Sequence, residues 1–173
     1  LGTSQANVSA YESGTKAMGA DLVERVDALR ELTEDSDYRL GWPGTLASLA
    51  AAVRSHLRVD PENTDTPLRL AIQASDDASR LTHAADLDFF LAQPGTTGSH
   101  RWNVLIAALA VDIARRTGRP TTPGWTRDRS RYLTDTWWFG AAEDVPTLRA
   151  LAYRDAPSAF RARGVMLSRS VLE

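Results

Sequence analysis

The sequence predicts a mainly α-helical protein. Apolar residues recur at helical spacing in several stretches, most clearly between residues 101 and 117. No segment alternates apolar and polar residues for long enough to require a β-sheet, and no internal repeat is visible. The chain has 173 residues, of which 43% are hydrophobic and 24% charged, as in an ordinary globular protein. We therefore expect one main helical domain with a smaller N-terminal appendage.

Composition limits the classes of function. The chain has no cysteine, which excludes disulfides and thiolate metal sites and is typical of a cytoplasmic protein. The formal net charge is −2, so contact with nucleic acid would need a local basic patch. No apolar run approaches the roughly 18 residues of a spanning helix, and the N-terminus lacks the pattern of a signal peptide. The sequence predicts a cytoplasmic protein that has no membrane partner.

The N-terminal residues predict two helices and a linker. Ser4 is a suitable N-cap for a short helix over Ser4–Tyr11, and Gly14 can end it in the left-handed conformation. A second helix is expected over Ala20–Leu32, where leucines and valines recur at helical spacing. Residues 33–41 are polar and acidic, as in a linker. We expect one domain over residues 1–35 and another over residues 36–173.

The second domain is expected to contain a series of helices. Pro43 precedes the first, over Gly44–Leu57, and "VDPENTDTP" then predicts a loop. Either one bent helix or two short ones follow, ended by "QPGTTG". Gly118 and Pro120 stop the clearest helix, and the tail "VMLSRSVL" fits either a strand or a frayed end. The remaining helices are predicted over Leu68–Leu81 with Ala84–Leu91, Arg101–Thr117, Pro146–Tyr153 and Ser158–Arg163.

The stretch "TSQANVSAYESG" has the residue types of a helix that enters the DNA major groove. Gln and Asn side chains can bond adenine bidentately, Ser can donate or accept, and Ala leaves room for a thymine methyl group. Val8 and Tyr11 supply an apolar back for packing on the rest of the domain. The following turn offers hydroxyls and a cation for phosphates. The residues predicted to contact DNA are Ser4, Gln5, Ala6, Asn7, Ser9, Ser13, Thr15 and Lys16.

The segment "GTSQANVSAYESG" resembles the second half of a phage-repressor-like helix-turn-helix of the Xre/Cro type. The resemblance covers residues 1–32 and makes Gly2 the turn glycine and residues 4–13 the recognition helix. It implies that Gln5, Ala6 and Ser9 lie nearest the bases of a double-stranded operator. It also implies that the first helices of the domain precede Leu1. The loop "TKAMGADL" departs from the family pattern, because Lys16 is its only cation.

The C-terminal half predicts an interaction domain. The stretches "GWTRDRSRYLTDTWWF" and "PTLRALAYRDAPSAFRARGVML" are similar to the C-terminal region of actinobacterial Xre-type proteins of toxin–antitoxin operons. That resemblance implies a homodimeric repressor whose C-terminal domain binds a cognate toxin. Trp137 and Trp138 are adjacent, and on a helix both could not face one core, so one is expected at an edge, interface or pocket. Four arginines would then meet an acidic or nucleotide-binding surface of the partner, or else lie on solvated helix faces: Arg131, Arg154, Arg161 and Arg163.

Two other functions remain open from the sequence. The first is a one-component regulator that senses a small molecule in a Trp-rich pocket. The second is an enzyme, for which "DLDF" offers the carboxylates Asp86 and Asp88 at a spacing used to hold Mg²⁺. The phosphate-binding glycine loop and third carboxylate of that chemistry are missing from the sequence, so we expect no catalytic residues. The three histidines are too far apart to share one helical turn, so neither a metal nor a cofactor is expected.

Overall fold

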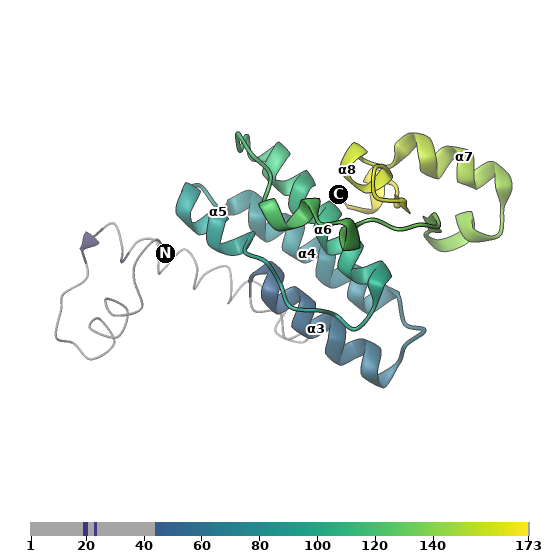
Figure 1. The fold of residues 1–173 in the computed structure, drawn as a ribbon, viewed down its shortest axis with the longest axis horizontal. Helices are drawn as coiled ribbons and strands as arrows, with labels where there is room; N and C mark the ends of the chain where they lie inside the picture. The colour runs from purple at the N-terminus through teal and green to yellow at the C-terminus, as the bar shows by residue number, and fades with distance from the viewer. Residues whose placement is uncertain (1–18, 21–22, 24–43, 173) are drawn as a thin grey trace.

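The computed structural model describes residues 19–20, 23 and 44–172 (Figure 1). Within residues 44–172 it contains six α-helices and a sheet of two short strands, so the prediction of a mainly α-helical protein is confirmed. The helices are α3 (Leu46–Val59), α4 (Asp65–Arg80), α5 (Ala84–Phe90), α6 (His100–Arg116), α7 (Pro146–Asp155) and α8 (Ser158–Arg161). Four 3₁₀-helices are η2 (Gly124–Arg127), η3 (Arg129–Arg131), η4 (Gly140–Glu143) and η5 (Arg169–Val171).

Helix α6 is the centre of the hydrophobic core. It contacts α3, α4 and α8 as well as the 3₁₀-helices η2 and η3 (Figure 1). The sequence predicts one apolar face, but the structure buries every residue from Val104 to Ala114, so all sides of the helix are covered. The small side chains of Ala107, Ala108 and Ala110 allow this close approach of neighbouring elements. One helix therefore organises the packing of the described domain.

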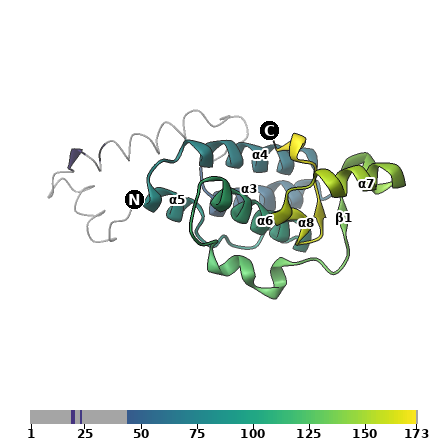
Figure 2. The same ribbon diagram turned by 90° about the horizontal axis from the view of Figure 1, so that it is seen from above.

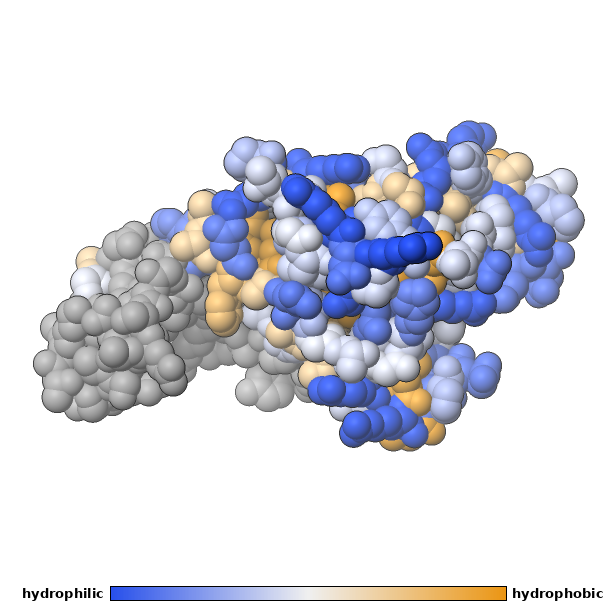
Figure 3. Space-filling view, in the orientation of Figure 1, coloured by the Kyte–Doolittle hydropathy of each residue, from blue (hydrophilic) through white to orange (hydrophobic). Residues whose placement is uncertain are grey.

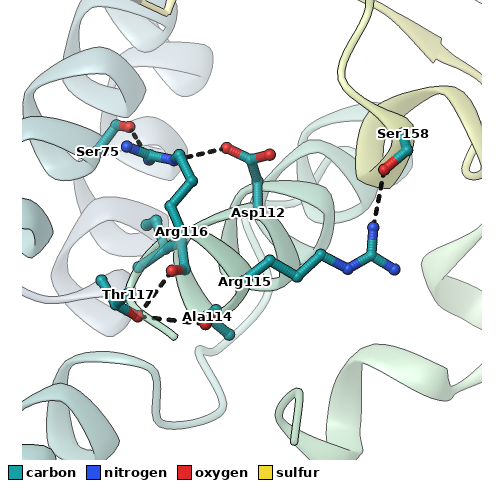
Figure 4. Close-up of polar contacts among 8 residues, drawn as sticks. Ser75, Asp112, Ala114, Arg115, Arg116, Thr117 and Ser158 are labelled. Carbon is teal, nitrogen blue, oxygen red and sulfur yellow. Dashed lines mark hydrogen bonds and ion pairs between the residues drawn. The ribbon is translucent and has the colours of Figure 1, made fainter. Parts of the chain in front are cut away.

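Polar side chains at the C-terminal end of α6 join it to two neighbours (Figure 4). The Arg116 guanidinium donates from Nε to Asp112 Oδ2 at 2.9 Å and from Nη2 to Ser75 Oγ of α4 at 2.6 Å. Arg115 Nη1 donates to Ser158 Oγ, the first residue of α8, at 2.9 Å. Because Ser75 is almost fully buried and bonded to a charged donor, its hydroxyl group has a partner that offsets its burial. These contacts fix the ends of three helices relative to one another.

The helix boundaries lie within two residues of the sequence predictions except at the start of α4. Thr45 caps α3 by accepting a hydrogen bond from the backbone N–H of Ser48. The helix therefore begins at Leu46, two residues later than predicted. The helix α4 begins at Asp65, so the last residues of the predicted loop form its first turn. Pro67 is tolerated there because first-turn N–H groups have no partner within the helix. The structure also resolves the open alternative between α4 and α5 as two separate helices.

The two strands, β1 (Trp137–Trp138) and β2 (Val165–Met166), pair in parallel. Trp137 N–H donates to Gly164 O at 2.8 Å, and Phe139 N–H donates to Met166 O at 3.3 Å. Gly164 has φ of +78°, and a Cβ at this position would lie 3.2 Å from Leu133 Cβ, so glycine is required by both conformation and space. The tail is thus a strand in its first two residues.

The first part of the chain between the strands forms a projecting unit, here called the arm, which consists of η4 and α7 (residues 140–155), and α8 then packs against α6. Figure 2 shows α7 at the end of the molecule, beyond α6 and α8. No side chain of α7 is buried. Arg149 fastens α7 to η4 by donating hydrogen bonds to the backbone oxygens of Ala142 and Glu143. The arm is therefore held by its own contacts and by the strands at its base.

The predicted recognition helix and the proposed boundary between residues 35 and 36 lie outside the described residues. The division into residues 1–35 and 36–173 stays a prediction for that reason. In the part of the chain that is described, no helix has the length and hydrophobicity needed to cross a membrane.

Candidate functional site

A groove of about 930 Å³ opens beside Trp102 and Trp137. Its walls come from α3, the α3–α4 connection, the loop before α6 and the first turn of α6. A volume of this size is in the range of small-molecule sites. The lining residues are Arg54, Leu57, Arg58, Pro61, Glu62, Thr64, Thr96, Thr97, Gly98, Ser99, Arg101, Trp102, Trp137 and Glu143.

The loop that forms one wall is held by hydrogen bonds to α6. Asn103 Oδ1 accepts from the backbone N–H of Thr97 at 2.8 Å, and Asn103 Nδ2 donates to Thr96 Oγ1 at 3.1 Å. Thr97 is almost fully buried, although its hydroxyl lies near the groove. Gly98 takes φ of +83°, a value that favours glycine, and turns the chain into the helix. This wall is preformed by one asparagine and one turn.

Two aromatic residues, Trp102 and Trp137, line the groove, and they belong to a cluster of three aromatic rings. The rings of Trp102 and Trp137 meet edge to face, with centroids 5.3 Å apart. Phe139 completes the cluster, with its centroid 4.2 Å from that of Trp137 and 6.1 Å from that of Trp102. Trp102 and Trp137 are only 3% and 5% exposed, so they support the groove and offer it little free aromatic surface. Two tryptophans thus lie beside a groove that is open and largely polar, and the Trp-rich sensing pocket stays a prediction.

Three arginines face this groove from two helices. Arg54 and Arg58 are one turn apart on α3, and Arg101 lies in the first turn of α6. None of them forms a hydrogen bond or ion pair within the described part of the chain. Glu62 and Glu143 also line the groove, yet neither is within ion-pair distance of the arginines. The guanidinium groups are therefore available to an anion.

The predicted partner residues of the C-terminal half are not brought together. Trp137 lies in the wall of the groove, whereas Trp138 is half-buried at the base of the arm, with the Arg149 guanidinium 5.6 Å from its ring centroid. Arg131 stacks elsewhere, 5.1 Å from the centroid of Trp125. The two tryptophans lie on a strand and not on a helix. Neighbouring side chains of a strand point to opposite faces, so the two rings enter different surroundings. Trp137 is buried and Trp138 half-buried, so their environments differ, although the helical premise of the prediction is wrong and their role in partner or ligand binding stays a prediction.

The expected arginine surface is also only partly present. Arg154 pairs with its neighbour Asp155, which raises the pKa of the guanidinium through a hydrogen bond between them. Arg161 stacks on Tyr153. Arg163, however, is buried, and it donates to the backbone oxygens of Thr126 at 2.9 Å and Ala159 at 3.1 Å. Burial lowers the pKa of Arg163, and its role in packing makes the prediction of a surface position wrong.

The arm carries a set of exposed apolar side chains. Val145, Leu148 and Leu151 are 39%, 36% and 45% exposed, and Tyr153 is 54% exposed. In Figure 3 apolar residues stand among hydrophilic ones at this end of the molecule. A helix that buries none of its own apolar residues on its own domain is unusual, since packing of an apolar face supplies most helix stability in proteins. This surface has the character of a contact site for another protein.

The candidate carboxylates for metal chemistry have separate environments. Asp86 is buried in the first turn of α5, whereas Asp88 is exposed and pairs with Arg119. Among the described residues, no group of three or more His, Asp or Glu side chains is placed to hold a metal ion. The geometry offers no metal centre for the enzyme hypothesis at this position.

The residues predicted to contact DNA lie outside the described residues. They are Ser4, Gln5, Ala6, Asn7, Ser9, Ser13, Thr15 and Lys16. The DNA-reading role stays a prediction from the sequence.

The groove arginines were missed by sequence reasoning. Arg54 and Arg58 have the spacing of one helical turn, which the sequence does show. Their approach to Arg101 depends on tertiary packing and has no local signal. No protein-family model, curated protein or solved structure matches the chain.

Proposed function

We propose that the chain is part of a DNA-binding transcriptional regulator of the Xre type, in which the α-helical domain is a protein-interaction domain. Two features support this proposal. The segment "GTSQANVSAYESG" carries amide and hydroxyl residues of the types that read base edges. The arm carries apolar side chains that the domain itself leaves uncovered. The single observation that supports the interaction role is that no residue of helix α7 is buried.

The proposed regulator is a homodimer that reads two half-sites of an operator, as helix-turn-helix dimers do. Its proposed partner is a toxin encoded beside it. The arm presents leucines together with Arg154, and Arg161 of α8 stacks on Tyr153 of the arm, so the matching surface on the partner would be apolar and bordered by carboxylates. Such an arrangement makes the protein an antitoxin that also represses its own operon.

The DNA-reading part of the proposal is tested with Gln5→Ala and Ser9→Ala in the whole chain. Each lost base contact should weaken specific operator binding by about 1–3 kcal/mol, because the base edge loses its partner. The measurement is a gel shift on the protein's own promoter at two salt concentrations. Nonspecific binding to unrelated duplex DNA should change little, since phosphate contacts provide it. Unchanged promoter affinity in the double variant would contradict the DNA-reading role.

The interaction part is tested with Leu148→Glu and Leu151→Glu in the arm. Loss of two buried anchors at an interface should weaken binding of the co-expressed operon partner by about thirtyfold or more. The midpoint of thermal unfolding should stay unchanged, because both side chains are exposed in the domain. Binding is measured by calorimetry with the purified partner. The matched control is Val59→Glu at the end of α3, which is 88% exposed and outside the arm.

Three outcomes distinguish the occupants of the arm. Weaker partner binding in the arm variants alone supports the proposal. Full partner affinity in folded variants contradicts it. A change from dimer to monomer in sedimentation, with no effect on the partner, would assign the surface to a second copy of the chain.

A second candidate function is a one-component regulator that responds to a small molecule. The groove beside Trp102 and Trp137 favours it, because the groove is preformed and its arginines are unpaired. This function and the interaction role can coexist in one domain, since the groove and the exposed face of α7 involve different helices.

A further inference from the structure

We propose that the groove between α3 and α6 binds a phosphorylated small molecule through Arg54, Arg58 and Arg101. This inference names the ligand class of the second candidate function above and is independent of the DNA-reading role. It depends on geometry within residues 44–172 alone. The position, charge and size of the groove each support it.

The position of the arginines suits a single anionic group. Arg54 and Arg58 are four residues apart on α3, so they lie on the same face of the helix. Arg101 reaches the groove from the first turn of α6, and its guanidinium lies 5.7 Å from the ring centroid of Trp137. Stacking on the ring limits the freedom of that guanidinium, which lowers the entropy lost when it binds a ligand. The planar guanidinium group of arginine presents several N–H donors that match phosphate oxygens better than the ammonium group of lysine does.

The charges of the groove are incompletely balanced. Like charges at positions i and i+4 of a helix repel each other, so Arg54 and Arg58 destabilise α3 slightly in the absence of an anion. Arg54 is half-buried and still has no ion-pair or hydrogen-bond partner in the described part of the chain. A bound phosphate would remove this repulsion and supply acceptors to both guanidinium groups.

The hydroxyl groups that line the groove and the N-terminal end of α6 also favour a phosphate ligand. Thr64, Thr96 and Ser99 line the groove and can donate to phosphate oxygens. Helix α6 begins at this point, and the side chain of its N-cap residue Ser99 accepts no hydrogen bond from the first turn. The positive end of the helix dipole therefore adds to the field of the three arginines.

The size of the groove favours a small molecule over nucleic acid. Its volume of about 930 Å³ would hold a mononucleotide-sized compound. The backbone of a DNA duplex is convex and is usually gripped by protruding cations, whereas Arg54 is half-buried in a concave surface. Glu62 and Glu143 at the same groove would also repel a continuous polyanion more than one phosphate group held at the arginines.

The test is titration of the whole chain with inorganic pyrophosphate and, separately, with ADP at constant ionic strength. Binding is followed by calorimetry and by tryptophan fluorescence, because Trp102 and Trp137 line the groove. We expect saturable binding that weakens as potassium chloride is raised. The change Arg54→Gln or Arg58→Gln should each weaken binding about tenfold or more, and the double variant about a hundredfold.

The matched control is Arg127→Gln, an exposed arginine of η2 outside the groove, which should bind both probes normally. Thermal unfolding of every variant shows that the fold is retained. Binding of both probes, or of ADP alone, with the stated losses supports the proposal. Absence of binding by both probes overturns it, and so does binding that the arginine variants leave unchanged. An oligonucleotide duplex is titrated as a third probe. If it alone binds, and the arginine variants lose that binding, the arginines belong to a nucleic-acid site and the proposal is overturned.

Discussion

Replacement of Trp137 by alanine is expected to lower the free energy of unfolding by about 3–5 kcal/mol. The side chain is 5% exposed and joins the core to the sheet, so its removal leaves a cavity beside Trp102 and Phe139. It also removes two ring contacts, each of which contributes about 0.5–1.5 kcal/mol beyond the buried area. Urea denaturation followed by circular dichroism measures the change.

The neighbouring Trp138 provides the control for this experiment. Trp138 is half-buried, and its ring makes a cation–π contact with the Arg149 guanidinium of the arm. An exposed cation–π contact contributes about 0.5–1 kcal/mol, so Trp138→Ala should cost far less than Trp137→Ala. Equal losses in the two variants would contradict the placement of Trp137 in the core and of Trp138 at the edge.

Replacement of Leu109 by alanine should cost about 2–5 kcal/mol, as expected for a leucine in a tightly packed core. Leu109 has no exposed surface and lies at the middle of α6, the helix that contacts α3, α4 and α8. Because the surroundings are fixed by several elements, the cavity can collapse only partly. The measurement is the midpoint of urea unfolding together with its slope, which should stay constant if only stability changes.

The same leucine-to-alanine change at the exposed position Leu151 is the control, because it removes the same atoms from a site outside the core. Leu151 is 45% exposed on α7, so Leu151→Ala should change stability by about 0.5 kcal/mol or less. A large loss at Leu151 that depends on protein concentration would show that α7 is covered in solution by another copy. A large loss independent of concentration would contradict the exposed position of the arm.

Most helices of the described domain could be predicted from the sequence because their signals are local. The apolar repeat from Trp102 to Ala114 is long and continuous, and Gly118 follows it with the left-handed conformation that ends a helix. The start of α4 was less predictable. Pro67 and the polar residues before it suggest a loop, although the same residues are acceptable in a first helical turn.

The sheet could not be predicted, because its strands have only two residues each. Their pairing depends on contacts between residues 137–138 and 165–166, which no local pattern reports. The close approach of Gly164 to Leu133 is likewise a tertiary constraint. The sequence did indicate that the two tryptophans differ, since adjacent side chains seldom share one environment in any regular structure.

The groove illustrates the same limit for the candidate site. Each lining arginine resembles a solvated helix residue when the sequence is read alone. Only the packing of α3 against α6 brings Arg54 and Arg101 to one surface. Gln5 and Ser9 are the reverse case, since the prediction that they contact DNA depends on a local sequence pattern and stays a prediction.

The parallel pairing of β1 with β2 has a consequence for how the protein can diverge. The ladder pairs Trp137 with Val165 and Trp138 with Met166, so the arm leaves the body after one strand and the chain returns through α8 to the other strand. An insertion within the arm would alter the outer surface without displacing α8, α6 or the arginines of α3, because no residue of α7 is buried. Recognition of a new partner would thus be acquired through changes in the arm while the rest of the molecule keeps its architecture.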